Sequence, residues 1–183
     1  MFVHEPRKKV IETRTLVLWE NPEMAYKALD LCSEIEGRVQ RTSFSIEEAN
    51  FRDLASNRRG NNLQGDACLA DLLILAPKDT RRPPPARLKT WLKQWSTLRR
   101  RDEGGLAVLR TIGRLDEDQI PRMVRDFHQH STPVLPEEAD FHRFVQEIAK
   151  RARVDLLWGA VESELEEAMR NFSFLRSLQS MDP

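Results

Sequence analysis

Five short apolar segments, separated by stretches with helical periodicity, dominate the hydrophobic pattern of this chain. The clearest is Leu72 to Ala76, which is apolar at every position and directly follows Asp71. A continuous apolar run of this length is typical of a strand that is covered on both faces, as in a parallel sheet. The pattern therefore predicts strands at 15–19, 38–44, 72–76, 106–109 and 154–158.

Helices are predicted between these strands. Asn21-Pro22 is typical of a helix start, with Asn at the N-cap and Pro at the first helical position. Apolar residues then recur at helical spacing up to Gly37. Further helices are predicted at 63–70, 86–101, 121–130, 136–152 and from 159 onward, and 113–136 is predicted as an insertion. Residues 45–59 are predicted as a loop that contains one helical turn, with Ile46, Phe51 and Leu54 as its anchors in the core.

Strands that alternate with helices favour parallel pairing through right-handed crossovers. The expected fold is an α/β three-layer sandwich: a five-stranded, mostly parallel sheet in the flavodoxin-like order 2-1-3-4-5, with helices on both faces and a C-terminal helix. We expect one domain over residues 14–172, with residues 1–13 and 173–183 as flexible or partner-binding tails.

Composition narrows the class of protein. The 183 residues carry 29 Lys and Arg against 29 Asp and Glu, and 40% are hydrophobic, which is too apolar for a disordered chain. No apolar run approaches the roughly 20 residues of a spanning helix, and the N-terminus lacks the apolar stretch of a signal peptide. Two cysteines, Cys32 and Cys68, do not make a disulfide framework. They indicate a cytoplasmic protein with two buried thiols.

Two segments carry a resemblance to known proteins. The first combines the Asp-led apolar strand and a proline-bearing turn with the helix that contains Lys89-Thr90-Trp91-Leu92-Lys93-Gln94-Trp95. The second runs from Phe144 to Arg153 into an apolar strand. Together they resemble a group of small uncharacterised bacterial proteins with a receiver-like or flavodoxin-like domain, over roughly residues 15–158. The resemblance implies the fold and a bacterial cytoplasmic origin, and no activity.

In this fold, ligands bind at the carboxyl ends of the strands. The residues expected there include Glu20 after the first strand, Lys78 and Asp79 after the third, and Arg110 after the fourth. These four residues form the candidate cleft for the alternative function, a small-ligand-binding protein or an enzyme.

Phosphoryl transfer to a receiver domain requires an acidic pair after strand 1 and an aspartate at the end of strand 3, because Mg²⁺ prefers several hard oxygen ligands. Here Ala76 stands at the phosphoacceptor position and Glu20 is followed by Asn21. Leu157-Trp158-Gly159 stands where a receiver has a Lys-Pro pair. We therefore expect a receiver-like domain without phosphorylation chemistry.

Cofactor binding is not expected either. A flavin phosphate loop needs small hydroxyl residues and glycine, so that backbone N–H groups surround the phosphate. Trp19-Glu20-Asn21-Pro22-Glu23 instead supplies two carboxylates, which repel phosphate, and a proline, which lacks an N–H. The glycines do not form a dinucleotide or nucleoside triphosphate motif.

The candidates for metal or nucleophile chemistry are weak. Cys68 lies inside a predicted helix without the glycine-flanked turn that exposes a nucleophile. His128 and His130 are two residues apart, and on a helix they point to different faces. Asp116-Glu117-Asp118 precedes Pro121 and fits favourable negative charge at a helix start. We expect no catalytic residue and no metal site.

One basic stretch differs from the chain as a whole, whose formal net charge is zero. It contains no acidic residue between positions 81 and 101, and its eight cations are Arg81, Arg82, Arg87, Lys89, Lys93, Arg99, Arg100 and Arg101. Because Trp91 and Trp95 fall on the apolar stripe and not among these cations, we interpret the stretch as the solvated side of an amphipathic helix. Nucleic-acid binding is not expected, because no stacking aromatics are interleaved with the cations.

These observations favour a non-catalytic, receiver-like protein-interaction module with a signalling or regulatory role. Its partner is expected to be another protein or a second copy of the chain. Phe174, Leu175 and Leu178 have no evident place in the predicted core, and they are the candidate contact residues.

Overall fold

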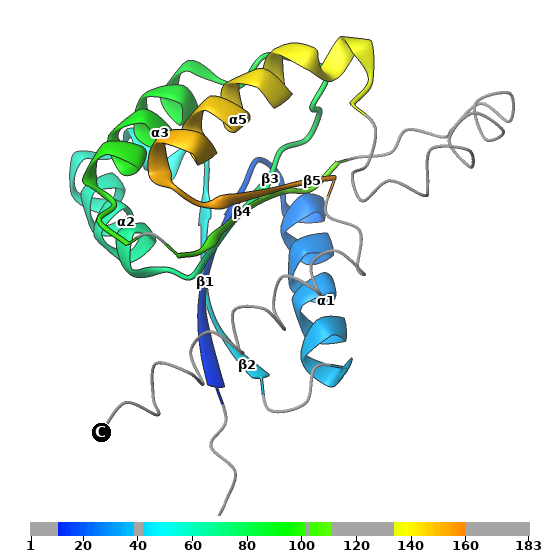
Figure 1. Ribbon diagram of the computed structural model, residues 1–183, viewed down its shortest axis with the longest axis vertical. Coiled ribbons are helices and arrows are strands. Elements are labelled where there is room, and N and C mark those ends of the chain that lie inside the picture. The colour runs from blue at the N-terminus through cyan, green and yellow to red at the C-terminus, as the bar shows by residue number, and fades with distance from the viewer. Residues whose placement is uncertain (1–10, 39–41, 102, 111–133, 160–183) are drawn as a thin grey trace, which may run out of the picture.

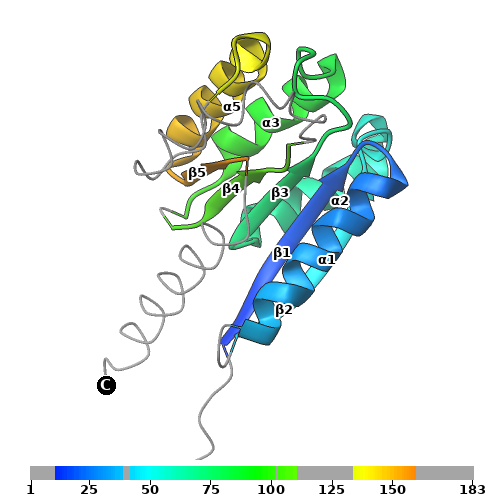
Figure 2. The same cartoon turned by 90° about the vertical axis from the view of Figure 1, so that its right-hand side faces the viewer.

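A twisted five-stranded sheet forms the centre of the molecule (Figures 1 and 2). The computed structural model describes residues 11–38, 42–101, 103–110 and 134–159. All four strand pairs are parallel and the order is β2-β1-β3-β4-β5, which confirms the predicted flavodoxin-like topology. The strands are β1 (Ile11–Trp19), β2 (Thr42–Asn50), β3 (Leu72–Ala76), β4 (Gly105–Val108) and β5 (Asp155–Trp158).

Helices cover both faces of the sheet. One face carries α2 (Asn57–Leu69), α3 (Ala86–Leu98) and α5 (Ala139–Ala152), and the opposite face carries α1 (Pro22–Arg38) (Figure 1). Asn21 caps α1 as predicted, because its side-chain Oδ1 accepts a hydrogen bond from the Met24 N–H at 3.1 Å. Residues 113–133 of the predicted 113–136 insertion, and residues 160 onward of the predicted C-terminal helix, lie outside the described residues.

The core is divided by the sheet into two clusters. Every residue of β3 is buried, so its side chains alternate between the two layers. Leu73 and Leu75 pack with α2, α3 and α5, whereas Leu72 and Ile74 pack with α1. This two-sided burial explains why β3 gives an unbroken apolar run in the sequence.

The prediction for β2 was wrong in its boundaries. The strand runs from Thr42 to Asn50 and not from 38 to 44, and Ile46 is exposed instead of anchoring a loop. β2 is an edge strand, and all four of its residues from position 45 to 48 are exposed, so polar residues hid the strand pattern. Phe51 and Leu54, the other two predicted anchors, are buried.

The helix after β2 also begins earlier than predicted, at Asn57 and not at 63. Ser56 caps it, since the Ser56 hydroxyl accepts a hydrogen bond from the Arg59 N–H at 3.4 Å.

α2 packs on α3 through two indole groups, because the indole N–H groups of Trp91 and Trp95 donate to the carbonyls of Gly60 and Ala67. Both tryptophans are core residues, as their place on the apolar stripe predicts.

Two cations of the basic stretch have structural roles at the end of α2. The Arg99 guanidinium is buried and donates to the carbonyls of Ala67 and Ala70, and Arg101 donates to the carbonyl of Leu69. Cations are favoured at a helix C-terminus, where carbonyls lack partners within the helix. Arg99 also donates to the carbonyl of Glu103, two residues before β4, so part of the positive charge serves to end α2 and to join it to the segment that leads into β4.

Candidate functional site

The carboxyl ends of the strands, where the four cleft residues were expected, form a set of internal contacts. The register pairs Trp19 at the end of β1 with Ala76 at the end of β3, so the loops after these strands start side by side. The Glu20 carboxylate accepts a hydrogen bond from the backbone N–H of Lys78 at 2.7 Å. Glu20 thus holds the loop after β3, and the structure brings these two predicted residues together.

Asp79 turns toward its own loop. Its carboxylate accepts hydrogen bonds from the backbone N–H and the Nε of Arg81, at 3.0 and 2.9 Å. The hydrogen bond from the Arg81 side chain is the main reason that the pKa of Asp79 lies below its usual value. Arg82 lies 3.6 Å from the other carboxylate oxygen. The arrangement is a local charge-assisted turn.

Arg110 forms the most buried ion pair at the carboxyl ends of the strands. Its partner is Glu138, which the sequence did not predict for this site. The Nε of Arg110 donates to one carboxylate oxygen of Glu138 at 2.9 Å, and its Nη2 donates to the other. The two side chains are only 6% and 3% exposed. The Thr80 hydroxyl and the backbone N–H of Leu135 also donate to this carboxylate. Glu138 therefore joins the loops after β3 and β4 to the start of α5.

A sequence signal for Glu138 existed. It stands at the third position after Leu135, in a Pro-Glu-Glu helix start where an acidic side chain commonly bonds back to the backbone N–H of the cap residue. The sequence pattern predicts only a helix for this segment. Nothing in the sequence indicated that the same carboxylate meets Arg110.

Two rings, those of Trp158 and His142, lie beside the Arg110–Glu138 pair. The Arg110 guanidinium lies 5.9 Å from the centre of the Trp158 ring, and His142 meets the same ring edge-on at 4.8 Å. Burial lowers the pKa of His142, with Glu138 acting in the opposite direction. This edge therefore holds a compensated charge pair and a histidine whose pKa lies below its ordinary value.

The end of β3 has no carboxylate. Ala76 is fully buried, and its carbonyl accepts a hydrogen bond from the Glu20 N–H at 3.1 Å. The Trp19 side chain is partly buried against the core cluster on the α1 side. The end of β3 is thus a buried alanine whose backbone is bonded to the loop after β1.

Comparisons with known proteins identify no family for this chain. No protein-family description and no curated protein sequence match it. A solved flavodoxin from Streptococcus pneumonia TIGR4 is similar at 11% identity with a TM-score of 0.42, over 86% of this chain and 92% of that one. The flavodoxin-like fold follows from the strand order and the helical layers described above.

Within the described ranges, neither a metal site nor a membrane-spanning helix is present. No three His, Cys, Asp or Glu side chains there lie close enough to share a metal ion. None of the helices in those ranges combines the length and apolar character needed to cross a bilayer.

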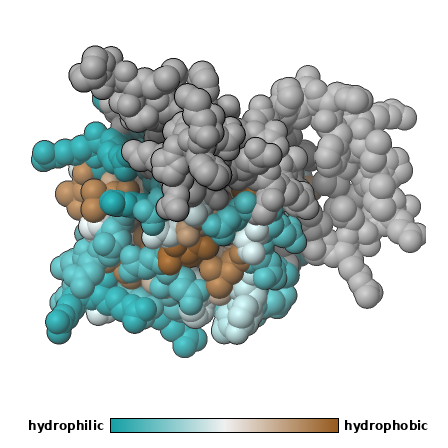
Figure 3. Space-filling view, turned by 90° about the horizontal axis from the view of Figure 1, so that it is seen from below, coloured by the Kyte–Doolittle hydropathy of each residue, from teal (hydrophilic) through white to brown (hydrophobic). Residues whose placement is uncertain are grey.

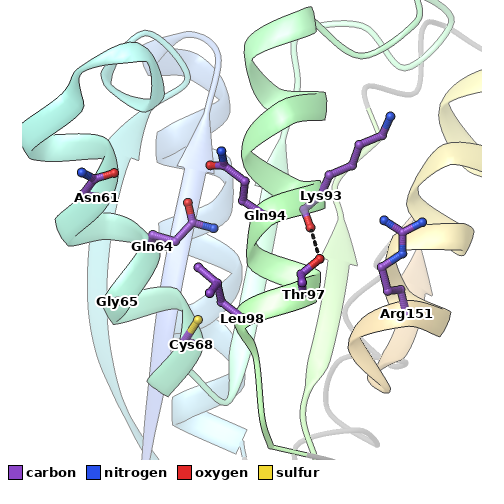
Figure 4. A pocket seen from close by; sticks show the side chains of 9 residues that line it. All are labelled: Asn61, Gln64, Gly65, Cys68, Lys93, Gln94, Thr97, Leu98 and Arg151. Carbon is purple, nitrogen blue, oxygen red and sulfur yellow. Dashed lines mark hydrogen bonds between the residues drawn. The ribbon is translucent and has the colours of Figure 1, made fainter.

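A solvent-open groove lies on the face of the sheet that carries α2, α3 and α5, away from the carboxyl ends of the strands. It has a volume of about 770 Å³ and runs along α3 between α2 and α5 (Figure 4). Cys68 lines it and is half-buried, so the prediction of two buried thiols is right for Cys32 and wrong for Cys68. Burial raises the pKa of Cys32 to about 12 and raises that of Cys68 as well.

Proposed function

We propose that this chain is a non-catalytic, receiver-like protein-interaction module of the bacterial cytoplasm, with a signalling or regulatory role. The observation that supports the proposal most is the Arg110–Glu138 pair at the strand-end edge. In the alternative function, an enzyme or ligand-binding protein, Arg110 is expected to face a substrate. Its guanidinium instead binds a buried carboxylate at two points.

The other strand-end contacts support the same proposal. Glu20 bonds to the backbone of the neighbouring loop and Asp79 bonds to Arg81, so both carboxylates stabilise loops. Ala76 at the end of β3 leaves no carboxylate to accept a phosphoryl group. A receiver-like domain whose strand-end edge is fixed in this way acts through its surface.

The test for the module is its state in native extracts at native expression level. A tagged chain is separated by size, and the complex is then analysed by cross-linking and mass spectrometry. We expect the chain to elute in a stoichiometric complex larger than its own 21.3 kDa. Elution as the free chain would overturn the proposal, and turnover or saturable binding of a small molecule would then favour the alternative.

Two chemical tests distinguish the proposed module from a phosphorylated receiver domain and from a flavin-binding flavodoxin. Incubation with Mg²⁺ and a small phosphodonor is expected to leave the chain unphosphorylated by mass spectrometry. Added FMN is expected to keep its fluorescence, because the loop after β1 carries Glu20 and Glu23 where a phosphate would bind. A stable acyl phosphate near residues 71–79, or saturable quenching of FMN, would contradict these expectations.

A further inference from the structure

The groove on the helical face has a composition that points to a partner. We call it the α3 groove, and its lining comes from three helices. The lining residues are Asn61, Gln64, Gly65 and Cys68 from α2, Lys93, Gln94, Thr97 and Leu98 from α3, and Arg151 from α5 (Figure 4).

The charge of the α3 groove is positive and uncompensated. Lys93 and Arg151 are exposed, and neither takes part in an ion pair within the part of the chain that the structure describes. They extend from α3 and α5, which lie next to each other (Figure 4). The lining contains no Asp or Glu. An occupant of this groove is therefore expected to carry negative charge.

The groove also offers apolar contact at the C-terminal end of α3. Leu98 lines it and is 57% exposed, and Leu69 at the end of α2 is 54% exposed. Figure 3, which views the molecule from below, shows hydrophobic patches between hydrophilic side chains on the described surface. A Cβ added at Gly65 would meet no atom within 4 Å, so this position leaves space between the two helices.

We propose that the α3 groove docks an acidic amphipathic helix of a partner protein. This inference rests on the proposed function, since it assigns the surface and the partner chemistry of the interaction module. Acidic side chains of the incoming helix pair with Lys93 and Arg151, and an apolar side chain packs on Leu98. Helices that lie in grooves between other helices are a common mode of peptide recognition.

Other occupants fit this surface less well. An extended peptide needs main-chain partners, but the walls of the groove are helices whose backbone groups are already bonded within α2 and α3. A symmetric second copy would place Lys93 and Arg151 against the same cations. Nucleic acid would find the cations, but the lining has no aromatic ring on which bases stack.

The test is a titration of the ¹⁵N-labelled full chain with synthetic helical peptides, followed by NMR. The probe is a 20-residue amphipathic helix with a leucine stripe and glutamates on both sides of it. One control peptide has lysine in place of each glutamate, and a 20-nucleotide single strand is the second control. We expect the acidic peptide alone to bind, to shift the side-chain amide signals of Gln64 and Gln94, and to slow alkylation of Cys68.

Charge reversal then tests the two cations. The double variant Lys93→Glu and Arg151→Glu is expected to bind the acidic peptide about tenfold more weakly or worse, because each exposed pair contributes modestly and reversal adds repulsion. The matched control is Arg87→Glu with Arg100→Glu, which changes the net charge equally at exposed positions outside the lining and is expected to bind normally. Gly65→Leu fills the groove without changing the charge and is expected to weaken binding as well.

Each other outcome overturns the inference. Preferential binding of the lysine peptide or the oligonucleotide excludes an acidic helix as the occupant. Equal binding by both charge-reversed variants excludes the α3 groove as the site, and sedimentation of the wild-type chain as a dimer that Gly65→Leu disrupts makes a second copy the occupant.

The native complex separates failure of this inference from failure of the module. If the wild-type chain forms a complex and the Lys93→Glu and Arg151→Glu variant keeps it, the groove is wrong and the module stands. If the wild-type chain forms no complex, the module itself fails, whatever the peptides do.

Discussion

Arg110 and Glu138 form a two-point ion pair that is almost closed to solvent and joins the loop after β4 to the start of α5. The same carboxylate accepts a hydrogen bond from Thr80 in the loop after β3. One side chain thus fixes three segments that are distant in sequence. A single buried carboxylate therefore holds the loops after β3 and β4 against the start of α5.

Removing this carboxylate is expected to destabilise the fold strongly. Glu138→Gln leaves the buried Arg110 guanidinium without its carboxylate, and breaking a buried pair in this way costs about 3–5 kcal/mol. The measurement is the free energy of unfolding from denaturant titration. Glu137→Gln is the control, because Glu137 is exposed on the same helix start, and we expect a change of less than about 0.5 kcal/mol there.

A double replacement distinguishes the destabilisation caused by an unpaired buried charge from the contribution of the ion pair to the free energy of unfolding. Arg110→Met with Glu138→Leu removes both charges, and such replacements are often neutral or stabilising. We expect the double variant to unfold at higher denaturant than Glu138→Gln. If it is equally unstable, Thr80 and the Leu135 N–H depend on the carboxylate more than Arg110 does.

A second prediction concerns the tight contact between Gly104 and Arg99. Gly104 has a φ of +143°, and a Cβ there would lie 2.3 Å from an Arg99 guanidinium nitrogen and 2.8 Å from the Asp71 carbonyl oxygen. Gly104→Ala is therefore expected to lower the free energy of unfolding by about 1–3 kcal/mol, through backbone strain and displacement of Arg99.

Gly65→Ala is the matched control for Gly104→Ala. Gly65 lies within α2, and an added methyl group meets open space. Alanine is favoured over glycine in a helix by about 0.5–1 kcal/mol, so this variant is expected to be more stable than the wild type. Unchanged stability of Gly104→Ala would show that neither the positive φ nor the contact with Arg99 constrains this position.

The histidine beside the ion pair makes stability depend on pH. Burial beside Trp158 lowers the pKa of His142 below the ordinary value of 6.5. As pH falls below 6.5, the unfolded chain takes up a proton at His142 and the folded chain does not, so folding stability decreases. We expect the stability advantage of the wild type over His142→Gln to be present above pH 6.5 and to shrink below it.

The titration of His142 provides a direct check. His142→Gln identifies its imidazole signal in NMR spectra, and the midpoint of that signal is expected below pH 6.5 in the native state. A midpoint at or above 6.5 would mean that attraction by Glu138 exceeds the combined effect of burial and of repulsion by Arg110. The remaining histidines are present in both proteins and do not affect the comparison.

The sequence was sufficient for the topology because the inner strands are buried on both faces. β3 and β4 are buried at every position, so their apolar runs are unambiguous, and parallel pairing followed from the helices between them. β2 was misplaced because an edge strand with polar, exposed residues lacks that signal. Its neighbour α2 was predicted too short because its first turns are polar and only one side of the helix packs.

The candidate site was less predictable for a different reason. The positions of Glu20, Lys78, Asp79 and Arg110 at the strand ends followed from the topology, but the direction of each side chain depended on contacts with other loops. Arg110 meets Glu138, 28 residues away, and Thr80 meets it across 58 residues. No local pattern encodes such distant contacts. The α3 groove likewise combines side chains from three helices that only the packed structure brings together.

The last prediction concerns the C-terminal tail, which lies outside the described residues and stays a prediction from sequence. Deletion of residues 173–183 is expected to leave the domain folded, by circular dichroism and cooperative unfolding, and to weaken self-association or partner binding. Phe174, Leu175 and Leu178 have no predicted place in the core, and burial of each in an interface contributes roughly 1.5–3 kcal/mol. A full-length variant with serine at these three positions is the control for chain length and is expected to match the deletion. If the truncated chain unfolds, the tail belongs to the core. If it folds and sediments and binds like the wild type, the three side chains form no contact surface.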